Sequence, residues 1–207
     1  MSERHVSPLA HRSPLQGTGN AISLAERPGV NMLNLRADAK AANRALKKAS
    51  GLALPEKPNT SSHAKQTRIL WLGPDEWLLL SDPGSKEMLQ DQIEKAFART
   101  HHQLLDVSDQ NAVIELSGDK ARELLMKLTT LDLHPTVFQP GDVAGSHFGR
   151  TTATLQLQDT GSAKDDDAFV LIVRRSYADY LWCLLAKAGR EFGLPDQKPQ
   201  AGEIMRP

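Results

Sequence analysis

Apolar and polar residues alternate in the first ordered part of the chain and then follow a helical period. VNMLNLR (30–36) alternates as a half-buried strand does. The segment that follows (37–51) has Asp38 as an N-cap, an alanine-leucine face, lysines in its last turn and Gly51 as a stop. The pattern predicts a strand followed by a helix.

A hairpin, a second helix and a further strand are predicted next. RILWLG (68–73) and EWLLLS (76–81) are apolar runs on either side of a short turn. Residues 86–98 place their apolar side chains on one helical face, and QLLDV (103–107) is typical of a short strand. Residues 30–107 therefore predict the order βαββαβ.

The second part of the chain repeats this order without its last strand. The pattern predicts a strand at 111–118, a helix capped by Asp119, strands at 150–158 and 168–174, and a helix at 177–192 capped by Ser176. VNMLNLRAD (30–38) aligns with NAVIELSGD (111–119), and a constant offset aligns Asp75 with Asp167 and Trp77 with Phe169. This similarity has two explanations, a duplication of ferredoxin-like units or only the shared pattern of hairpin and helix.

The predicted fold class is α+β, with duplicated ferredoxin-like (βαββαβ) units and antiparallel sheets. The aperiodic segments, rich in Pro, Ser or polar residues, predict tails and a loop. The expected organisation is an extended tail at 1–20, one domain at 21–193 with halves at about 30–107 and 111–192, an internal loop at 54–68 and a tail at 194–207.

Composition narrows the possible partners and compartments. Lysine plus arginine and aspartate plus glutamate both number 25, so net charge does not favour nucleic acid or a membrane surface. Neither a transmembrane run nor a secretory signal is visible. The single cysteine, Cys183, excludes an internal disulfide and an all-thiolate metal site. We expect a cytoplasmic protein.

The adjacent carboxylates of Asp75 and Glu76 are the most prominent candidates for acid-base chemistry. Neighbouring residues of a strand point to opposite faces, however, and Pro74 followed by aspartate suits the centre of a turn. DVSD (106–109) puts a serine between two acids but lacks a local histidine. Both segments are interpreted as structural, and we expect no catalytic, cofactor or metal residue on this chain.

Five residues are candidates for contacts with a partner. Trp71, Trp77 and Trp182 are either core residues or aromatic anchors of an interface. Arg174 and Arg175 end a strand just before a helix, where an anion or a partner's carboxylate could dock. Solvated arginines are the alternative explanation.

Residues 104–185 resemble the folate-binding fold of the aminomethyltransferase family. The similarity lies in LLDVSD (104–109), a strand that ends in Gly-Asp before a helix (118–119) and a Pro-Gly-Asp turn (140–142). With SPLAHR (7–12), LWLGPDEWLLLS (70–81) and RRSYADYLWCLLAKAGREFG (174–193), the chain looks like the gamma subunit of heterotetrameric sarcosine oxidase.

The resemblance implies a complex that oxidatively demethylates sarcosine to glycine with hydrogen peroxide, and that forms 5,10-methylenetetrahydrofolate when tetrahydrofolate is present. It also implies that alpha, beta and delta subunits carry NAD, tetrahydrofolate, FAD, FMN and zinc, whereas gamma has no cofactor of its own. The strand 149–158 lacks the carboxylate of catalytic aminomethyltransferases. This departure favours a non-catalytic, structural subunit.

Two other hypotheses remain open at the level of the sequence. The first is a stand-alone folate-binding protein of the same fold, either aminomethyltransferase-like or an iron–sulfur maturation factor. The second is a ligand-binding module that holds an anion with Arg174 or Arg175.

Overall fold

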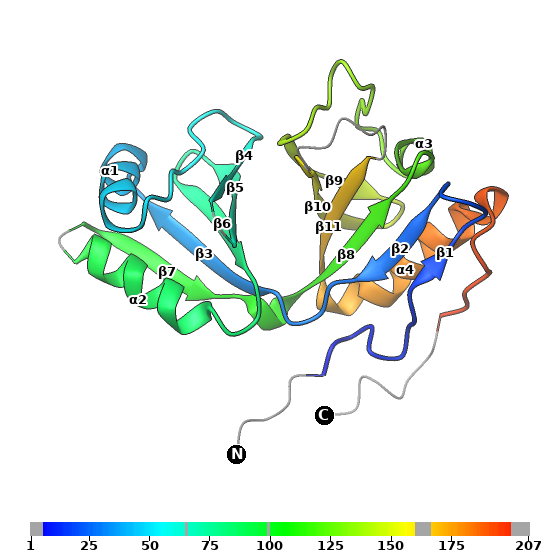
Figure 1. Ribbon diagram of the computed structural model, residues 1–207, viewed down its shortest axis with the longest axis horizontal. Coiled ribbons are helices and arrows are strands. Elements are labelled where there is room, and N and C mark those ends of the chain that lie inside the picture. The colour runs from blue at the N-terminus through cyan, green and yellow to red at the C-terminus, as the bar shows by residue number, and fades with distance from the viewer. Residues whose placement is uncertain (1–5, 65, 99, 160–166, 200–207) are drawn as a thin grey trace. The chain divides into compact units, whose positions relative to one another are not determined.

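The computed structural model describes residues 6–64, 66–98, 100–159 and 167–199. These residues form two compact units. The central unit comprises Gly29–Ser108 and Gly141–Val143, and the terminal unit comprises the described residues up to Pro28, Asp109–Pro140 and the described residues from Ala144 onward. Each unit combines helices with an antiparallel sheet, so the predicted α+β class is confirmed (Figure 1).

The central unit places its strands in the order β4-β5-β6-β3-β7. Its elements are β3 (Asn31–Ala37), α1 (Ala39–Ser50), β4 (Ser61–Ala64), β5 (Thr67–Gly73), β6 (Glu76–Ser81), α2 (Lys86–Phe97) and β7 (His102–Asp106). Each pair of neighbouring strands is antiparallel. The predicted loop 54–68 contains the edge strand β4, which the pattern did not reveal because its polar residues bury no apolar face.

Helices α1 and α2 pack on one face of the central sheet. Ala42 and Leu46 of α1 and three apolar residues of α2 meet the same face. The α2 residues are Leu89, Ile93 and Phe97. The other residues of this core are Leu33, Leu35, Ala37, Leu52, Leu54, Ile69, Trp77 and Leu79. Each large apolar side chain buried in this way contributes about 1.5–3 kcal/mol.

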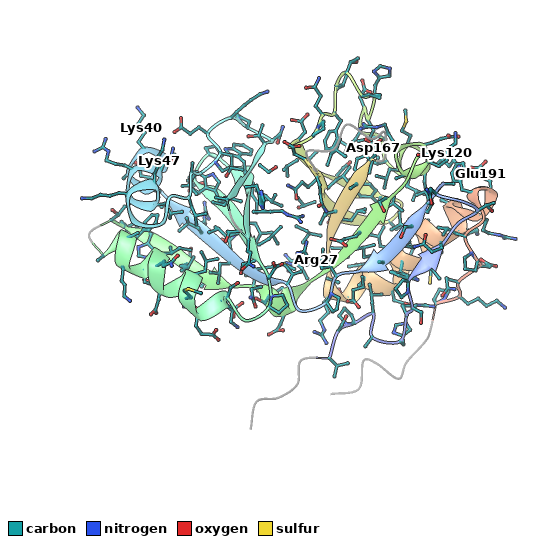
Figure 2. The ribbon with its side chains drawn as sticks, viewed as in Figure 1. Arg27, Lys40, Lys47, Lys120, Asp167 and Glu191 are labelled. Atoms are coloured by element: carbon teal, nitrogen blue, oxygen red, sulfur yellow. The ribbon has the colours of Figure 1, made fainter. Side chains whose placement is uncertain are left out.

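Helix α1 begins and ends where the sequence predicts. The Asp38 carboxylate accepts a hydrogen bond from the Ala41 backbone N–H at 2.9 Å. Gly51 adopts a left-handed conformation with φ of 74°, and its N–H donates to the Lys47 carbonyl. The exposed Lys40 and Lys47 lie on this helix (Figure 2).

The terminal unit places its strands in the order β1-β2-β8-β11-β10-β9. Its elements are β1 (Leu15–Gln16), β2 (Ser23–Glu26), η1 (Ser108–Gln110, which begins at the boundary), β8 (Asn111–Ser117), α3 (Ala121–Met126), β9 (Val143–Phe148), β10 (Thr151–Leu157), β11 (Ala168–Arg174), η2 (Arg175–Tyr177), α4 (Ala178–Ala188) and η3 (Arg190–Phe192). No helix in the described part of the chain is long and apolar enough to cross a membrane.

Helices α3 and α4 likewise pack on one face of the terminal sheet. Its core combines alternate residues of three strands with Leu9, Leu15, Ile22 and Leu24 from the beginning of the chain. The strand residues are Ala112, Ile114, Leu116, Ala153, Leu155, Leu157, Phe169, Leu171 and Val173. Because successive side chains of a strand point to opposite faces of a sheet, the intervening residues lie on the face away from these helices.

Strand register is equivalent in the two units. Leu35 lies opposite Trp77 in the central sheet, and Leu116 lies opposite Phe169 in the terminal sheet. The second half lacks a final strand in the sequence pattern, but β2 pairs with β8 just as β7 pairs with β3, antiparallel and at the same side.

The ends of the chain differ from the expected tails. Leu9 and Leu15 are buried, and β1 pairs with β2. Leu194 is buried as well. The prediction of extended tails rests on the lack of a hydrophobic period in these segments. Short segments can nevertheless bury single apolar residues without forming a regular apolar face.

The N-cap residues of two helices also differ from those that the sequence predicts. Helix α3 has Lys120 at its N-cap, and no side chain caps it, so Asp119 does not have the predicted role. Helix α4 begins after the 3₁₀ turn η2, which contains Ser176, so the serine precedes the N-cap residue Tyr177. In both cases a turn intervenes before the α-helix starts.

Candidate functional site

A polar network joins the N-terminal segment Ser7–Arg12 to helix α4. The Arg12 Nε atom donates to Asp179 Oδ1 at 2.8 Å, and Arg12 Nη2 lies 2.6 Å from the same oxygen. His11 Nε2 lies 2.9 Å from that oxygen too. The Arg12 side chain is only 5% exposed. Removing a guanidinium from water in this way requires that its donors find partners.

The remaining donors of Arg12 bind three further groups. Nη1 donates to Gln197 Oε1 at 3.0 Å, and Nη2 donates to the Lys198 carbonyl at 2.9 Å. Nη2 also lies 3.2 Å from Cys183 Sγ. One buried side chain thus connects the N-terminal segment, α4 and residues 197–198. We call these contacts the Arg12 network.

Cys183 has the environment of a structural thiol. It is buried, and burial raises its pKa, as does the nearby Asp179 carboxylate, whereas Arg12 lowers it. The balance keeps the thiol protonated at neutral pH. Cys183 is therefore a small apolar residue within α4, as the sequence predicts.

A second polar contact fixes the beginning of the same segment. The Ser7 hydroxyl donates to Glu26 Oε1 on β2. Burial raises the pKa of Glu26, while the hydrogen bond from Ser7 and the charge of His11 act in the opposite direction. Between these polar contacts lies the fully buried Leu9. SPLAHR is accordingly a packed and hydrogen-bonded part of the terminal unit.

The carboxylates of Asp75 and Glu76 point to separate partners. Asp75 Oδ2 accepts from Arg36 Nη2 at 2.9 Å, and Glu76 Oε1 accepts from Asn34 Nδ2 at 2.8 Å. Pro74 and Asp75 form the turn between β5 and β6. The predicted turn is confirmed, and these two carboxylates do not face one another as an acid-base pair would.

The serine of DVSD stabilises the backbone. Asp106 Oδ1 accepts from the Ser108 hydroxyl at 2.6 Å and from its N–H at 3.0 Å, and the Ser108 hydroxyl accepts from the Met32 N–H at 2.9 Å. Burial by itself would raise the pKa of Asp106, but hydrogen bonds from Lys86 and Ser108 lower it overall. No cluster of His, Cys, Asp or Glu suited to a metal is found among the described residues.

Two of the three tryptophans named as candidate anchors lie in the cores of their own units. Trp77 and Trp182 are each 1% exposed, so the prediction that they anchor a partner is corrected in favour of the core alternative. Trp77 Nε1 donates to the Pro55 carbonyl at 3.1 Å, which satisfies its polar atom. Trp71 is partly exposed and packs against the edge of the central core.

The two candidate arginines have different surroundings. Arg175 Nη2 donates to the Val6 carbonyl at 2.6 Å, so this side chain helps to hold the N-terminal segment. Arg174 is exposed at the end of β11 and lines a pocket of about 360 Å³. A third arginine, Arg122 of α3, binds Asp167 through Nε and Nη2 at 2.6 and 2.8 Å. Figure 2 shows Asp167 beside α3.

Residues 36–191 match the model of the family described as sarcosine oxidase, gamma subunit. The chain belongs to the sarcosine oxidase gamma subunit family. A curated gamma subunit from Arthrobacter sp is 34% identical over 132 residues, which are 63% of this chain and 64% of that subunit.

Solved structures extend this family likeness over nearly the whole chain. A chain of the heterotetrameric sarcosine oxidase from Corynebacterium sp. U-96, in complex with pyrrole 2-carboxylate, is 26% identical with a TM-score of 0.79, covering 93% of this chain and 98% of that one. Aminomethyltransferase T of the glycine cleavage system from Bartonella henselae shares the fold at 15% identity and a TM-score of 0.64. The match covers 84% of this chain and 47% of the transferase chain.

The sequence of this member of the gamma subunit family does not predict the Arg12 network. SPLAHR (7–12) and the segment 174–193 each resemble the family, but the sequence pattern does not predict that the two segments are in direct contact. Arg12 and Asp179 are 167 residues apart, and no local spacing links them. The sequence signal for this contact is limited to an arginine and an aspartate in two segments that resemble the same family.

Proposed function

We propose that this chain is a non-catalytic structural subunit of a heterotetrameric sarcosine oxidase. The observation that carries the proposal is the similarity to a chain of the Corynebacterium enzyme, which covers 93% of this chain and 98% of that one. In such a complex, sarcosine is demethylated to glycine with hydrogen peroxide, and tetrahydrofolate accepts the one-carbon unit as 5,10-methylenetetrahydrofolate. Alpha, beta and delta subunits carry NAD, tetrahydrofolate, FAD, FMN and zinc in the cytoplasm.

The proposal that the subunit is non-catalytic is supported by the contacts of its potentially reactive side chains. Asp75 and Glu76 bind different residues, Asp106 holds Ser108, and Cys183 is a buried thiol with a raised pKa. Each of these groups therefore has a structural partner. A catalytic group, by contrast, must reach a substrate atom within hydrogen-bond distance.

The finer organisation of the fold belongs to the same proposal. We interpret the units as two related ferredoxin-like halves of one folate-binding-like domain. The equivalent pairs Leu35–Trp77 and Leu116–Phe169 support duplication over coincidence, since a shared register is more specific than a shared order of elements. In the terminal half the fourth strand comes from β2.

Contacts with the other subunits are expected at exposed apolar and aromatic residues. Tyr177 is 49% and Val6 is 57% exposed. Arg175 Nη2 binds the Val6 carbonyl, and Arg175 lies in the same 3₁₀ turn, η2, as Tyr177. An arginine beside an aromatic residue is typical of interface anchors. We propose this group and the partly exposed Trp71 as interface residues, within an interface larger than about 2,000 Å².

An omission experiment tests the subunit role. The four subunits are co-expressed with and without this chain, and sarcosine-dependent oxygen consumption is measured. Omission is expected to abolish assembly or activity. In contrast, complexes that carry D75N, E76Q or C183S are expected to retain activity within about threefold, because changes outside an active site alter stability more than rate. Full activity without the chain would contradict the proposal.

A stand-alone folate-binding protein is the second candidate, and the shared fold with aminomethyltransferase T is the observation that favours it. Isothermal titration of the isolated chain with tetrahydrofolate separates the two candidates. The subunit proposal predicts no heat of binding. Micromolar binding that persists in the absence of other subunits would favour the second candidate instead.

A further inference from the structure

Three polar side chains form a row across three neighbouring strands of the terminal sheet. Arg174 of β11 lies directly opposite Asn111 of β8. On its other side, Ala153 pairs with Val173, so continuation of that register brings Thr152 of β10 next to Arg174. The neighbours Ala112, Ala153 and Val173 belong to the core beneath the helices. Alternation therefore directs Asn111, Arg174 and Thr152 to the opposite face, with about 4.8 Å between adjacent strands.

A pocket of about 360 Å³ lies over this row. Its lining includes His147, Thr154 and Ile172 in addition to the row itself. Gly145 also lines it, and a Cβ atom at this glycine would meet no atom within 4 Å, so the backbone here borders open space. The volume falls at the lower end of the range of about 300–1,000 Å³ that is typical of small-molecule sites.

The chemistry of the lining favours an anion. The guanidinium, amide, imidazole and hydroxyl groups of the lining can all donate hydrogen bonds, and none of the lining residues is a carboxylate. Among the residues that the structure describes, the Arg174 side chain makes no hydrogen bond or ion pair, whereas the side chains of Arg122 and Arg175 are engaged by Asp167 and the Val6 carbonyl. Within the described part of the chain, the guanidinium of Arg174 is therefore available to a ligand.

We propose that this pocket binds a carboxylate, which Arg174 holds in a bidentate pair while Asn111 and Thr152 donate from either side. The planar fork of arginine matches the two oxygens of a carboxylate. Ile172, in the next row, supplies an apolar surface for the carbon attached to that group. The carboxylate comes from a small free acid or from the chain of a neighbouring subunit.

Titration of the full chain with acetate at constant ionic strength tests the proposal by NMR. Saturable shifts are expected for the backbone amides of Asn111, Thr152 and Arg174. R174Q is expected to weaken acetate binding by at least about tenfold, as loss of a charge-assisted pair does. R174K keeps the charge without the fork, so it is expected to bind with intermediate affinity and serves if R174Q fails to fold.

The matched control is R175Q, which removes the same charge one residue away from the pocket. Its acetate affinity is expected to stay within about twofold of the parent chain, because screening weakens a charge that makes no direct contact. Absence of saturable shifts would overturn the proposal. Equal weakening by R174Q and R175Q would also overturn it, since that result indicates only a diffuse positive field.

The same titration on the assembled oxidase distinguishes the two sources of the carboxylate. The titration of the assembled oxidase rests on the proposed subunit function, whereas the titration of the isolated chain does not. Failure of the pocket proposal can therefore be told apart from failure of the proposed function. Acetate binding that is lost on assembly assigns the carboxylate to another subunit. Binding that persists at equal affinity assigns it to a free acid.

Discussion

Truncation of Arg12 to alanine tests whether the Arg12 network holds the terminal unit together. The substitution removes the donors to Asp179, Gln197 and the Lys198 carbonyl at once. His11 Nε2 still lies 2.9 Å from Asp179 Oδ1 in such a variant. The Asp179 carboxylate then loses the positive charge beside it, and at 25% exposure water replaces that charge only in part.

The expected loss follows from burial of this pair. Breaking a fully buried ion pair costs about 3–5 kcal/mol, whereas exposed pairs contribute about 0–1 kcal/mol. Arg12 is 5% exposed and Asp179 is 25% exposed, so we expect a destabilisation of about 2–4 kcal/mol, towards the buried limit. For a chain of this size the melting temperature falls by about 2–4 °C per kcal/mol.

Urea unfolding followed by far-UV circular dichroism measures the loss, and hydrogen exchange localises it to residues 9–12 and to α4. R190A is the matched control, because Arg190 is 60% exposed and lies 4.0 Å from Asp196. R190A is expected to change stability by less than about 0.5 kcal/mol. If R12A is no more destabilising than R190A, the reasoning about the Arg12 network is wrong.

Three further predictions concern the backbone and a titrating carboxylate. D38A is expected to reduce stability by about 1 kcal/mol through loss of the N-cap of α1, measured by urea unfolding. G118A is expected to destabilise by at least about 2 kcal/mol, because Gly118 has φ of 115° and a Cβ atom would lie 2.5 Å from the Ala21 carbonyl oxygen. G145A, where the space is open, serves as its comparison and is expected to stay near the parent stability. The folded-state pKa of Asp106 is lowered, so its stabilisation is present above the unfolded-state pKa and is lost as pH falls through the folded-state pKa. D106N should therefore be less stable than the parent at neutral pH, and the difference should close in acid; a constant difference would contradict this.

The sequence predicts the parts of the fold that have a buried apolar face. Alternation in β3 and β8, the helical stripe of α2 and the cap at Asp38 reflect burial or capping that a local segment must satisfy by itself. The short strands β1, β2, β4 and β9 do not follow this rule. They lie toward the edges of their sheets, where backbone pairing needs fewer apolar side chains and leaves a weaker pattern.

For the candidate sites, too, the sequence predicts only the features that depend on local patterns. Structural roles for Asp75, Glu76 and Cys183 follow from local turn and helix patterns. The Arg12 network and the row Asn111–Arg174–Thr152 do not, because each depends on the pairing of segments far apart in the chain. The buried positions of Trp77 and Trp182 likewise depend on which side of a strand or helix meets the core.

Purification of the tagged chain from its native cells tests the central claim most directly. The subunit composition of the eluate and its visible flavin absorbance are the quantities to measure. The proposed function predicts that the chain elutes with three other subunits in equal amounts and with bound flavin that sarcosine reduces. Elution of the chain alone and free of flavin would contradict it.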